Sequence, residues 1–154
     1  AALRKLVRDN VTMFPEIRGY VLLIEGFDYE RWPSWNRDDI RKWIDAWTHG
    51  VAIAAEEMHK INPAIEVLAW DYNIDFRRRS VDTKRYVIDR YAQDVIPLVT
   101  WENGKSFLRD GEEGYLKDYA INEVGPAEVS AAQIERARQR GMKVFAKADT
   151  FASW

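Results

Sequence analysis

The order of apolar and amphipathic segments in this sequence predicts an α/β fold with parallel strands. Residues 19–25, GYVLLIE, form a continuous apolar run closed by an acid, which is typical of a strand covered on both faces. Further short apolar runs follow at 65–73 and 95–104, and a helical pattern separates each run from the next. Strands that alternate with helices pair in parallel through right-handed crossovers.

The two helices between these strands are indicated by apolar residues that recur every three or four positions. The first helix extends to Ile61, with Asn36 or Ser34 as a plausible cap, and Pro63 follows its end. The second is expected over residues 82–93. Both are long enough to cross from the end of one parallel strand to the start of the next.

The last third of the chain predicts a hairpin and two more strands. Residues 105–118 contain two glycines and no helical stripe, as expected for an excursion or a small hairpin. Strands are expected at 119–125, YAINEVG, and at 142–151, MKVFAKADTF, with a helix over 127–140 between them. Gly141 ends this helix.

No strand is followed by a G-x-G-x-x-G turn or a P-loop, and this absence favours a (β/α) TIM-type barrel over a doubly wound sheet. A complete barrel takes about 250 residues, whereas five strands are counted here. The chain also lacks an initial Met and ends within FASW. We therefore expect residues 1–154 to be a single domain that holds about the first five βα units of a (β/α)8 barrel within a longer chain. The missing C-terminal half, or self-association, would cover the open edge of such a sheet.

The composition is that of a soluble globular protein, with 47% hydrophobic and 31% charged residues. A net charge of -2 with interspersed signs argues against nucleic acid and membrane surfaces as partners. No apolar run reaches the roughly 18 residues of a membrane-spanning helix. With no cysteine and only His49 and His59, we expect no transition metal and no cofactor. A chain without cysteine works in any redox environment, so the sequence does not indicate a cellular compartment.

Every expected strand ends near an acid. The carboxyl ends of parallel strands meet at one mouth, where ligands bind in βα folds. Acids make up 25 of the 154 residues, so an acid at all five strand ends exceeds what chance predicts, although an acid after a strand often only caps the next helix. The five acids are Glu25, Asp71, Glu102, Glu123 and Asp149.

Aromatic and amide residues lie among these acids, and the combination suits carbohydrate. Aromatic faces stack on sugar C–H surfaces, and amides and carboxylates bind hydroxyls. Alternatively, the tryptophans fill the top layer of the barrel. Lys147 and Asp149 alternate with alanines and are expected to face one side, where they bind a ligand or pair with each other; Glu25 has the same two readings. The expected aromatic and amide contacts are Trp70, Tyr72, Asn73, Trp101, Asn103, Asn122 and Trp154.

The segments FPEIRGYVLLIEG, EVLAWDYN, LVTWENG and AINEVGPAE give the chain a resemblance to the (β/α)-barrel glycoside hydrolases. It looks most like uncharacterised members related to the family 20 and other hexosaminidase-type barrels. The chain also resembles a second group, the large clan of barrel glycosidases. In that clan the acid/base after strand four is a Glu that follows an Asn, as Glu123 follows Asn122 here. This chain departs from both patterns, because Val-Gly-Pro follows the dipeptide and the adjacent Asp-Glu pair of family 20 is missing.

The resemblance implies hydrolysis of a glycosidic bond, with Glu102 and Glu123 as the two candidates for the general acid. One of them would protonate the leaving oxygen while a second carboxylate, or the substrate's own acetamido group, stabilises the oxocarbenium centre. Asp71 would orient that group or act as the partner carboxylate. The helix acids Glu56 and Glu57 are expected on the solvated surface.

Three other functions remain open at this point. A non-catalytic carbohydrate-binding barrel would keep the aromatic residues without an acid pair at a working separation. A metal-assisted barrel enzyme would use the clustered acids to bind Mg²⁺. A structural half-barrel would associate through its open edges.

Overall fold

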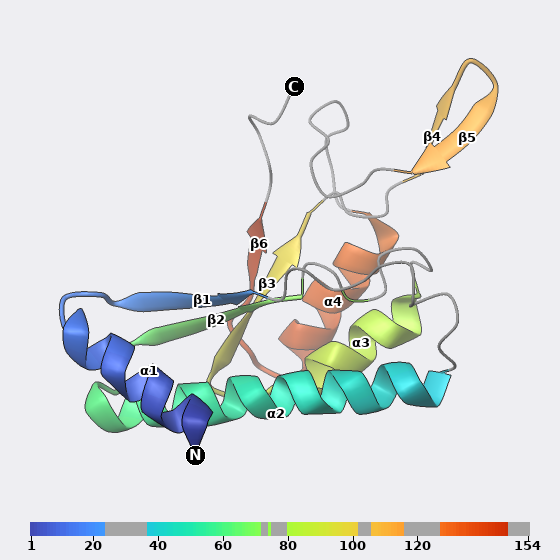
Figure 1. Cartoon of the computed structure of the whole chain (residues 1–154). Helices are drawn as coiled ribbons and strands as arrows, with labels where there is room; N and C mark the ends of the chain where they lie inside the picture. Colours follow the sequence, from blue (N-terminus) through green and yellow to red (C-terminus); the bar gives the residue numbers. More distant parts are fainter. Residues whose placement is uncertain (24–36, 72–73, 75–79, 102–105, 116–126, 148–154) are drawn as a thin grey trace.

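The computed structural model of the chain describes residues 1–23, 37–71, 74, 80–101, 106–115 and 127–147. Within these residues, four strands form one parallel sheet, and the helices pack against it (Figure 1). The predicted α/β fold with parallel strands is therefore confirmed at this level.

The sheet consists of β1 (Gly19–Leu23), β2 (Glu66–Trp70), β3 (Val95–Thr100) and β6 (Phe145–Lys147), in the order β1-β2-β3-β6. All three pairings are parallel. The four strands therefore point the same way, and their carboxyl ends lie at one edge of the sheet. One row of the register runs across all four strands and aligns Leu23, Trp70, Leu98 and Phe145.

The strand that pairs with β3 on the side away from β2 is not the one that we expected. We expected residues 119–125 to be the strand that follows β3, and this segment lies outside the described residues. β3 pairs with β2 on one side and with β6 on the other. The backbone N–H of Trp101 also donates to the carbonyl oxygen of Lys147 at 2.8 Å, which extends the pairing with β6. The segment that we counted as the fifth strand is thus the direct partner of β3.

Three helices connect the strands of the sheet and lie on the same side of it (Figure 1). They are α2 (Arg37–Ile61), α3 (Val81–Arg90) and α4 (Glu128–Gln139). Each corresponds to a predicted helix. The proposed caps Asn36 and Ser34 of α2 lie outside the described residues.

The hydrophobic core lies between the sheet and these helices. Val67, Ala69 and Val95 point from the sheet into the core, and Ile44 of α2 and Val87 of α3 pack against them. Burying a valine or isoleucine side chain contributes about 1.5–3 kcal/mol, so this layer stabilises the fold substantially.

The opposite face of the sheet is exposed at β1, which corrects our expectation that 19–25 is covered on both faces. Val21 is 52% exposed and Leu23 is 38% exposed, whereas Tyr20 and Leu22 pack against the core. No described helix covers this face. An apolar run alone did not distinguish a strand with two covered faces from one with an exposed apolar face.

The helix α3 ends at Arg90, three residues earlier than predicted, and the residue that follows α4 satisfies carbonyl groups at this end. The guanidinium of Arg140 donates to the carbonyl oxygens of Ile88 and Tyr91. Tyr91 itself adopts an extended backbone with φ -66° and ψ 141°. Orphan carbonyls at a helix end need such partners, so the end of α3 is set by a residue far along the chain.

The predicted small hairpin and the predicted helix end at Gly141 are both confirmed. A hairpin forms from β4 (Ser106–Arg109) and β5 (Glu112–Tyr115), which pair in antiparallel fashion. Its two turn residues, Asp110 and Gly111, have φ values of 53° and 82°. A two-residue turn with positive φ at both positions has a twist that matches the twist of the flanking strands. Gly141 has a φ of 67° and ends α4.

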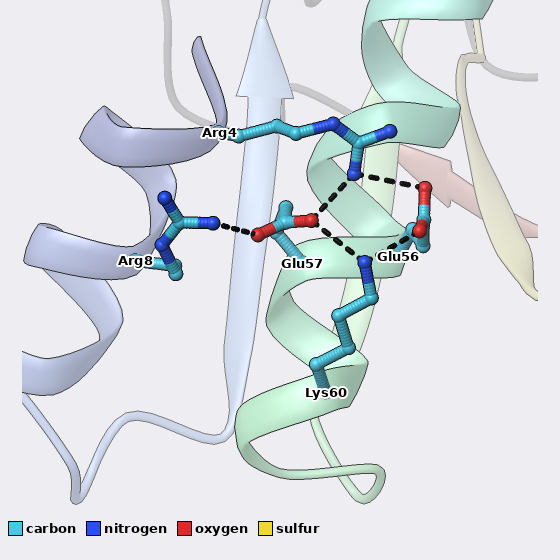
Figure 2. A network of polar contacts seen from close by, with 5 residues as sticks. All are labelled: Arg4, Arg8, Glu56, Glu57 and Lys60. Carbon is cyan, nitrogen blue, oxygen red and sulfur yellow. Dashed lines mark hydrogen bonds and ion pairs between the residues drawn. The ribbon is translucent and has the colours of Figure 1, made fainter. Parts of the chain in front are cut away.

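The helix α1 (Ala2–Met13) was not predicted, and a network of charged groups fixes it to α2 (Figure 2). Val7 and Val11 are its buried residues. Arg8 donates to one carboxylate oxygen of Glu57 at 2.6 Å, while Arg4 and Lys60 donate to the other oxygen, Lys60 at 2.8 Å.

The carboxylate at the centre of this network is buried, which corrects our expectation of a solvated surface residue. Glu57 is 2% exposed. Hydrogen bonds from Lys60, Arg4 and Arg8 lower its pKa to about 2 against the opposing effect of burial. Three cationic groups thus compensate one buried carboxylate, and two of them come from α1.

We expect the contribution of Glu57 to stability to be lost at acid pH. A depressed carboxyl pKa stabilises the fold above the unfolded-state pKa, and this stability disappears between about pH 5 and pH 2. Urea unfolding of the parent and of Glu57→Gln across this range should give a difference in free energy that shrinks as the pH falls. Glu66→Gln, at a half-exposed pair with Lys143, is the matched control. A difference between parent and Glu57→Gln that stays constant with pH would contradict this account.

Candidate functional site

The carboxyl ends of β2, β3 and β6 lie at the same edge of the sheet, the place where ligands bind in parallel βα folds. Successive residues of a strand point to opposite faces, so this edge carries two sets of side chains. Trp70, Thr100 and Lys147 share the face that no described helix covers. Asp71 and Trp101 belong to the helix side.

Trp70, Thr100 and Lys147 form one group of side chains, called here the Trp70 group. The indole Nε1 of Trp70 donates to Oγ1 of Thr100 at 2.8 Å, and Nζ of Lys147 lies 4.5 Å from the centroid of the Trp70 ring. The carbonyl oxygen of Thr100 accepts a hydrogen bond from Oγ of Ser130 at 2.6 Å, which fixes this strand end to α4. A hydrogen bond and a cation–π contact therefore hold the indole in place.

An apolar surface continues from the Trp70 group along the same face of the sheet. Leu23 and Leu98 flank Trp70 in the register, and Phe145 follows on the far side of Leu98; Leu23 and Phe145 are each 38% exposed. The half-buried indole of Trp70 and the exposed side chains of Leu23 and Phe145 thus lie on one face of the sheet, with the polar atoms of Thr100 and Lys147 beside the indole.

Asp71, one of the expected catalytic carboxylates, is buried on the helix side. It is 3% exposed, and its Oδ2 accepts hydrogen bonds from Lys84 Nζ at 2.9 Å and from Gln133 Nε2 at 2.6 Å. A buried carboxylate that is bonded to α3 and α4 holds these helices to the end of β2. This placement gives no support to a role for Asp71 in contact with substrate.

The same region contains a tyrosine with a strongly perturbed pKa. Burial raises the pKa of Tyr91 well above its usual range, and the negative charge of Asp71 acts in the same direction. Nε1 of Trp47 donates to the Tyr91 hydroxyl at 3.3 Å, which opposes the shift. The hydroxyl therefore stays protonated, as part of the packing between α2 and α3.

Trp101 lies apart from Trp70, although both were expected to contact a ligand. Its side chain lines a cavity of about 460 Å³ together with Ile134 of α4 and with Val144 and Ala146 at β6. Its carbonyl oxygen accepts a hydrogen bond from the backbone N–H of Ala127 at 2.9 Å. Trp101 is therefore a neighbour of α4 at the edge of the sheet.

Among the expected site residues, the structure thus brings Trp70 and Lys147 together, and it separates both of them from Asp71 and Trp101. The remaining expected residues lie outside the described part of the chain. They are Glu25, Tyr72, Asn73, Glu102, Asn103, Asn122, Glu123, Asp149 and Trp154.

Thr100, Lys84 and Gln133 were missed by sequence reasoning. Lys84 and Gln133 occupy inward positions of their helices, at four-residue steps from Ile88 and Ala137. A polar residue in an apolar stripe needs a buried partner, so a buried polar contact could have been predicted at both positions. No contact could have been predicted for Thr100, because a threonine fits a strand without any partner.

Within the described residues, no group of three or more histidine, cysteine or acidic side chains is placed to hold a metal ion, and no helix is long and apolar enough to span a membrane. The fold and this sheet edge define an α/β protein with a polar and aromatic group at the ends of parallel strands. Comparisons with protein-family models, with curated proteins and with solved structures found no match to the chain.

Proposed function

We propose that this chain belongs to a (β/α)-barrel glycoside hydrolase and binds carbohydrate at the carboxyl ends of its strands. The observation that carries the proposal is the Trp70 group, in which an indole is fixed by Thr100 and Lys147 beside an apolar surface. Sugar rings present C–H faces to aromatic side chains and hydroxyls to polar atoms at the rim.

The topology of the sheet supports a barrel over a doubly wound sheet. In the order β1-β2-β3-β6, each strand is added on the same side as the one before, and α2, α3 and α4 lie on one face (Figure 1). Doubly wound sheets reverse their strand order and carry helices on both faces. Sequential parallel strands with helices on the outside are typical of (β/α) barrels, whose inner face would correspond to the exposed face of this sheet.

The reaction that we propose is hydrolysis with a carboxylic acid as proton donor. Glu102 follows Thr100 by two residues in the sequence, directly beyond the strand that carries part of the Trp70 group, and Glu123 follows Asn122 in the motif that resembles barrel glycosidases. A general acid protonates the leaving oxygen, and a second carboxylate or an acetamido group stabilises the oxocarbenium centre.

Binding is tested by titrating the ¹⁵N-labelled protein with monosaccharides and oligosaccharides, including N-acetylhexosamine oligomers. We expect a saturable shift of the Trp70 indole resonance, assigned by its loss in Trp70→Phe. Trp70→Ala should weaken binding roughly tenfold, which corresponds to 1.4 kcal/mol. Trp43→Phe on α2 is the matched control, since Trp43 packs against the core on the helix side.

The reaction is tested with a panel of aryl glycosides that includes N-acetylhexosaminides. Release of the aryl alcohol is the expected result. A folded protein that binds sugar but hydrolyses no member of the panel would point to a non-catalytic carbohydrate-binding barrel. A Trp70 indole that responds to no sugar, together with no turnover, would overturn the proposal as a whole.

A further inference from the structure

A second cavity lies between the N-terminal turns of α2 and α3, outside the Trp70 group. It has a volume of about 270 Å³. Ile40 and Ile44 of α2 lie behind one wall of the cavity, because they are only 3% and 0% exposed. Its other side is formed by Tyr86 and Thr83 of α3, both half-buried. Cavities near this size accept a small organic molecule the size of one ring.

The aromatic wall of this cavity is fixed by its neighbours. The hydroxyl of Tyr86 donates to Oδ1 of Asp45 at 2.8 Å, and Nε of Arg90 lies 2.7 Å from the same oxygen. The guanidinium carbon of Arg41 lies 4.8 Å from the centroid of the Tyr86 ring. Stacking uses the face of a guanidinium, and its N–H groups point outward in the plane and remain able to donate.

Two arginines line this cavity from the same face of α2. Arg37 and Arg41 are one turn apart, a spacing at which like charges destabilise a helix. Among the described residues, no ion pair joins either guanidinium to a carboxylate. Asp82 is the acid among the described residues that line the cavity, so these residues combine two positive charges with one negative charge. This balance matches a ligand with a single negative charge.

We propose that this cavity binds a small ring carboxylate. Arg37 and Arg41 donate to the carboxylate, and the ring lies against Tyr86 and Thr83. Arginine forks match the geometry of carboxylates, and the half-buried side chains of Tyr86 and Thr83 supply aromatic and methyl surface that favours an apolar ring. An adjoining cavity of about 480 Å³ shares Arg37, Arg41 and Tyr86 and continues toward α4, so a substituent on the ring has room there.

The proposal is tested by NMR titration of the ¹⁵N-labelled protein with benzoate, and with benzyl alcohol as the neutral analogue. We expect saturable shifts of the amides in the first turns of α2 and α3 with benzoate, and none with benzyl alcohol. Arg41→Gln should weaken benzoate binding at least tenfold. Lys42→Gln removes the same charge from an exposed neighbouring position of α2 that does not line the cavity, and it should leave the affinity unchanged.

Arg37→Gln provides a second variant, because the exposed Arg37 has no described ion pair whose loss would disturb folding. It should weaken binding several-fold. Equal effects of Arg41→Gln and Lys42→Gln, or no saturation at roughly 10 mM benzoate, would overturn the proposal. Tighter binding of phenyl phosphate than of benzoate would overturn the assignment to a singly charged ligand. None of these outcomes depends on carbohydrate binding at Trp70, so the two proposals fail or stand separately.

Discussion

Replacing Lys84 by methionine is expected to lower the free energy of unfolding by about 3–5 kcal/mol, the cost of leaving one member of a buried ion pair without its partner. The side chains of Lys84 and Asp71 are 5% and 4% exposed, and their charged atoms lie 2.9 Å apart. Methionine fills a similar volume but cannot compensate the Asp71 carboxylate. Since a typical domain has only about 5–15 kcal/mol of stability, this loss should be evident in urea unfolding.

Two further variants separate the buried charge from other effects. Lys143→Met removes the partner of Glu66 in a pair with side chains 53% and 48% exposed, and it should cost no more than about 1 kcal/mol. The double variant Lys84→Met with Asp71→Asn removes both charges and should be more stable than Lys84→Met alone. A Lys84→Met protein within about 1 kcal/mol of the parent would show that the pair does not hold α3 to the strand end.

The strands of the sheet and the helices α2, α3 and α4 were predictable because hydrophobic periodicity is a local property of the sequence. The apolar runs at β2 and β3 and the stripe of α2 each contain the pattern within a single element. The end of α3 was not predictable in this way, because it depends on Arg140, about 50 residues further along the chain. The strand order was missed for the same reason, since pairing of β6 with β3 is a contact between distant segments.

The helix α1 illustrates a weaker signal. Leu3, Val7 and Val11 recur every four residues, but charged residues stand between them and the helix is short. Its position depends on a buried Glu57 that binds Arg4 and Arg8, and that arrangement is visible only once both helices are placed (Figure 2). Intrinsic propensity alone seldom decides a helix of this length.

The candidate site was predicted in part. The acids and aromatic residues at the strand ends were all expected to line one binding site, yet adjacent residues of a strand point to opposite faces. This rule alone separates Trp70 from Asp71. The hydrogen bond from Trp70 to Thr100 required the register of β2 against β3, which the sequence does not contain.

Replacing the general acid by glutamine is expected to lower kcat/KM for an aryl glycoside by about 10²–10⁴-fold, since this is the usual contribution of a positioned acid or base. Glu102→Gln and Glu123→Gln are compared under the same conditions. Only one of them should show the full loss on a substrate whose leaving group needs a proton. Glu112→Gln, an exposed position in the β4–β5 hairpin, is the control and should keep the parent activity.

The leaving group identifies the role of the sensitive residue. An aryl glycoside with a highly acidic phenol departs without protonation, so loss of the general acid should be largely rescued with that substrate, whereas loss of a nucleophile should not be rescued. Rescue in Glu123→Gln would agree with the Asn-Glu motif, and rescue in Glu102→Gln would place the acid directly after the strand that holds Thr100. If both variants kept turnover within a few-fold of the parent, neither residue would be the acid. The Trp70 group would then support sugar binding alone, because an indole fixed by Thr100 and Lys147 supplies contact with a ligand but no proton donor for the reaction.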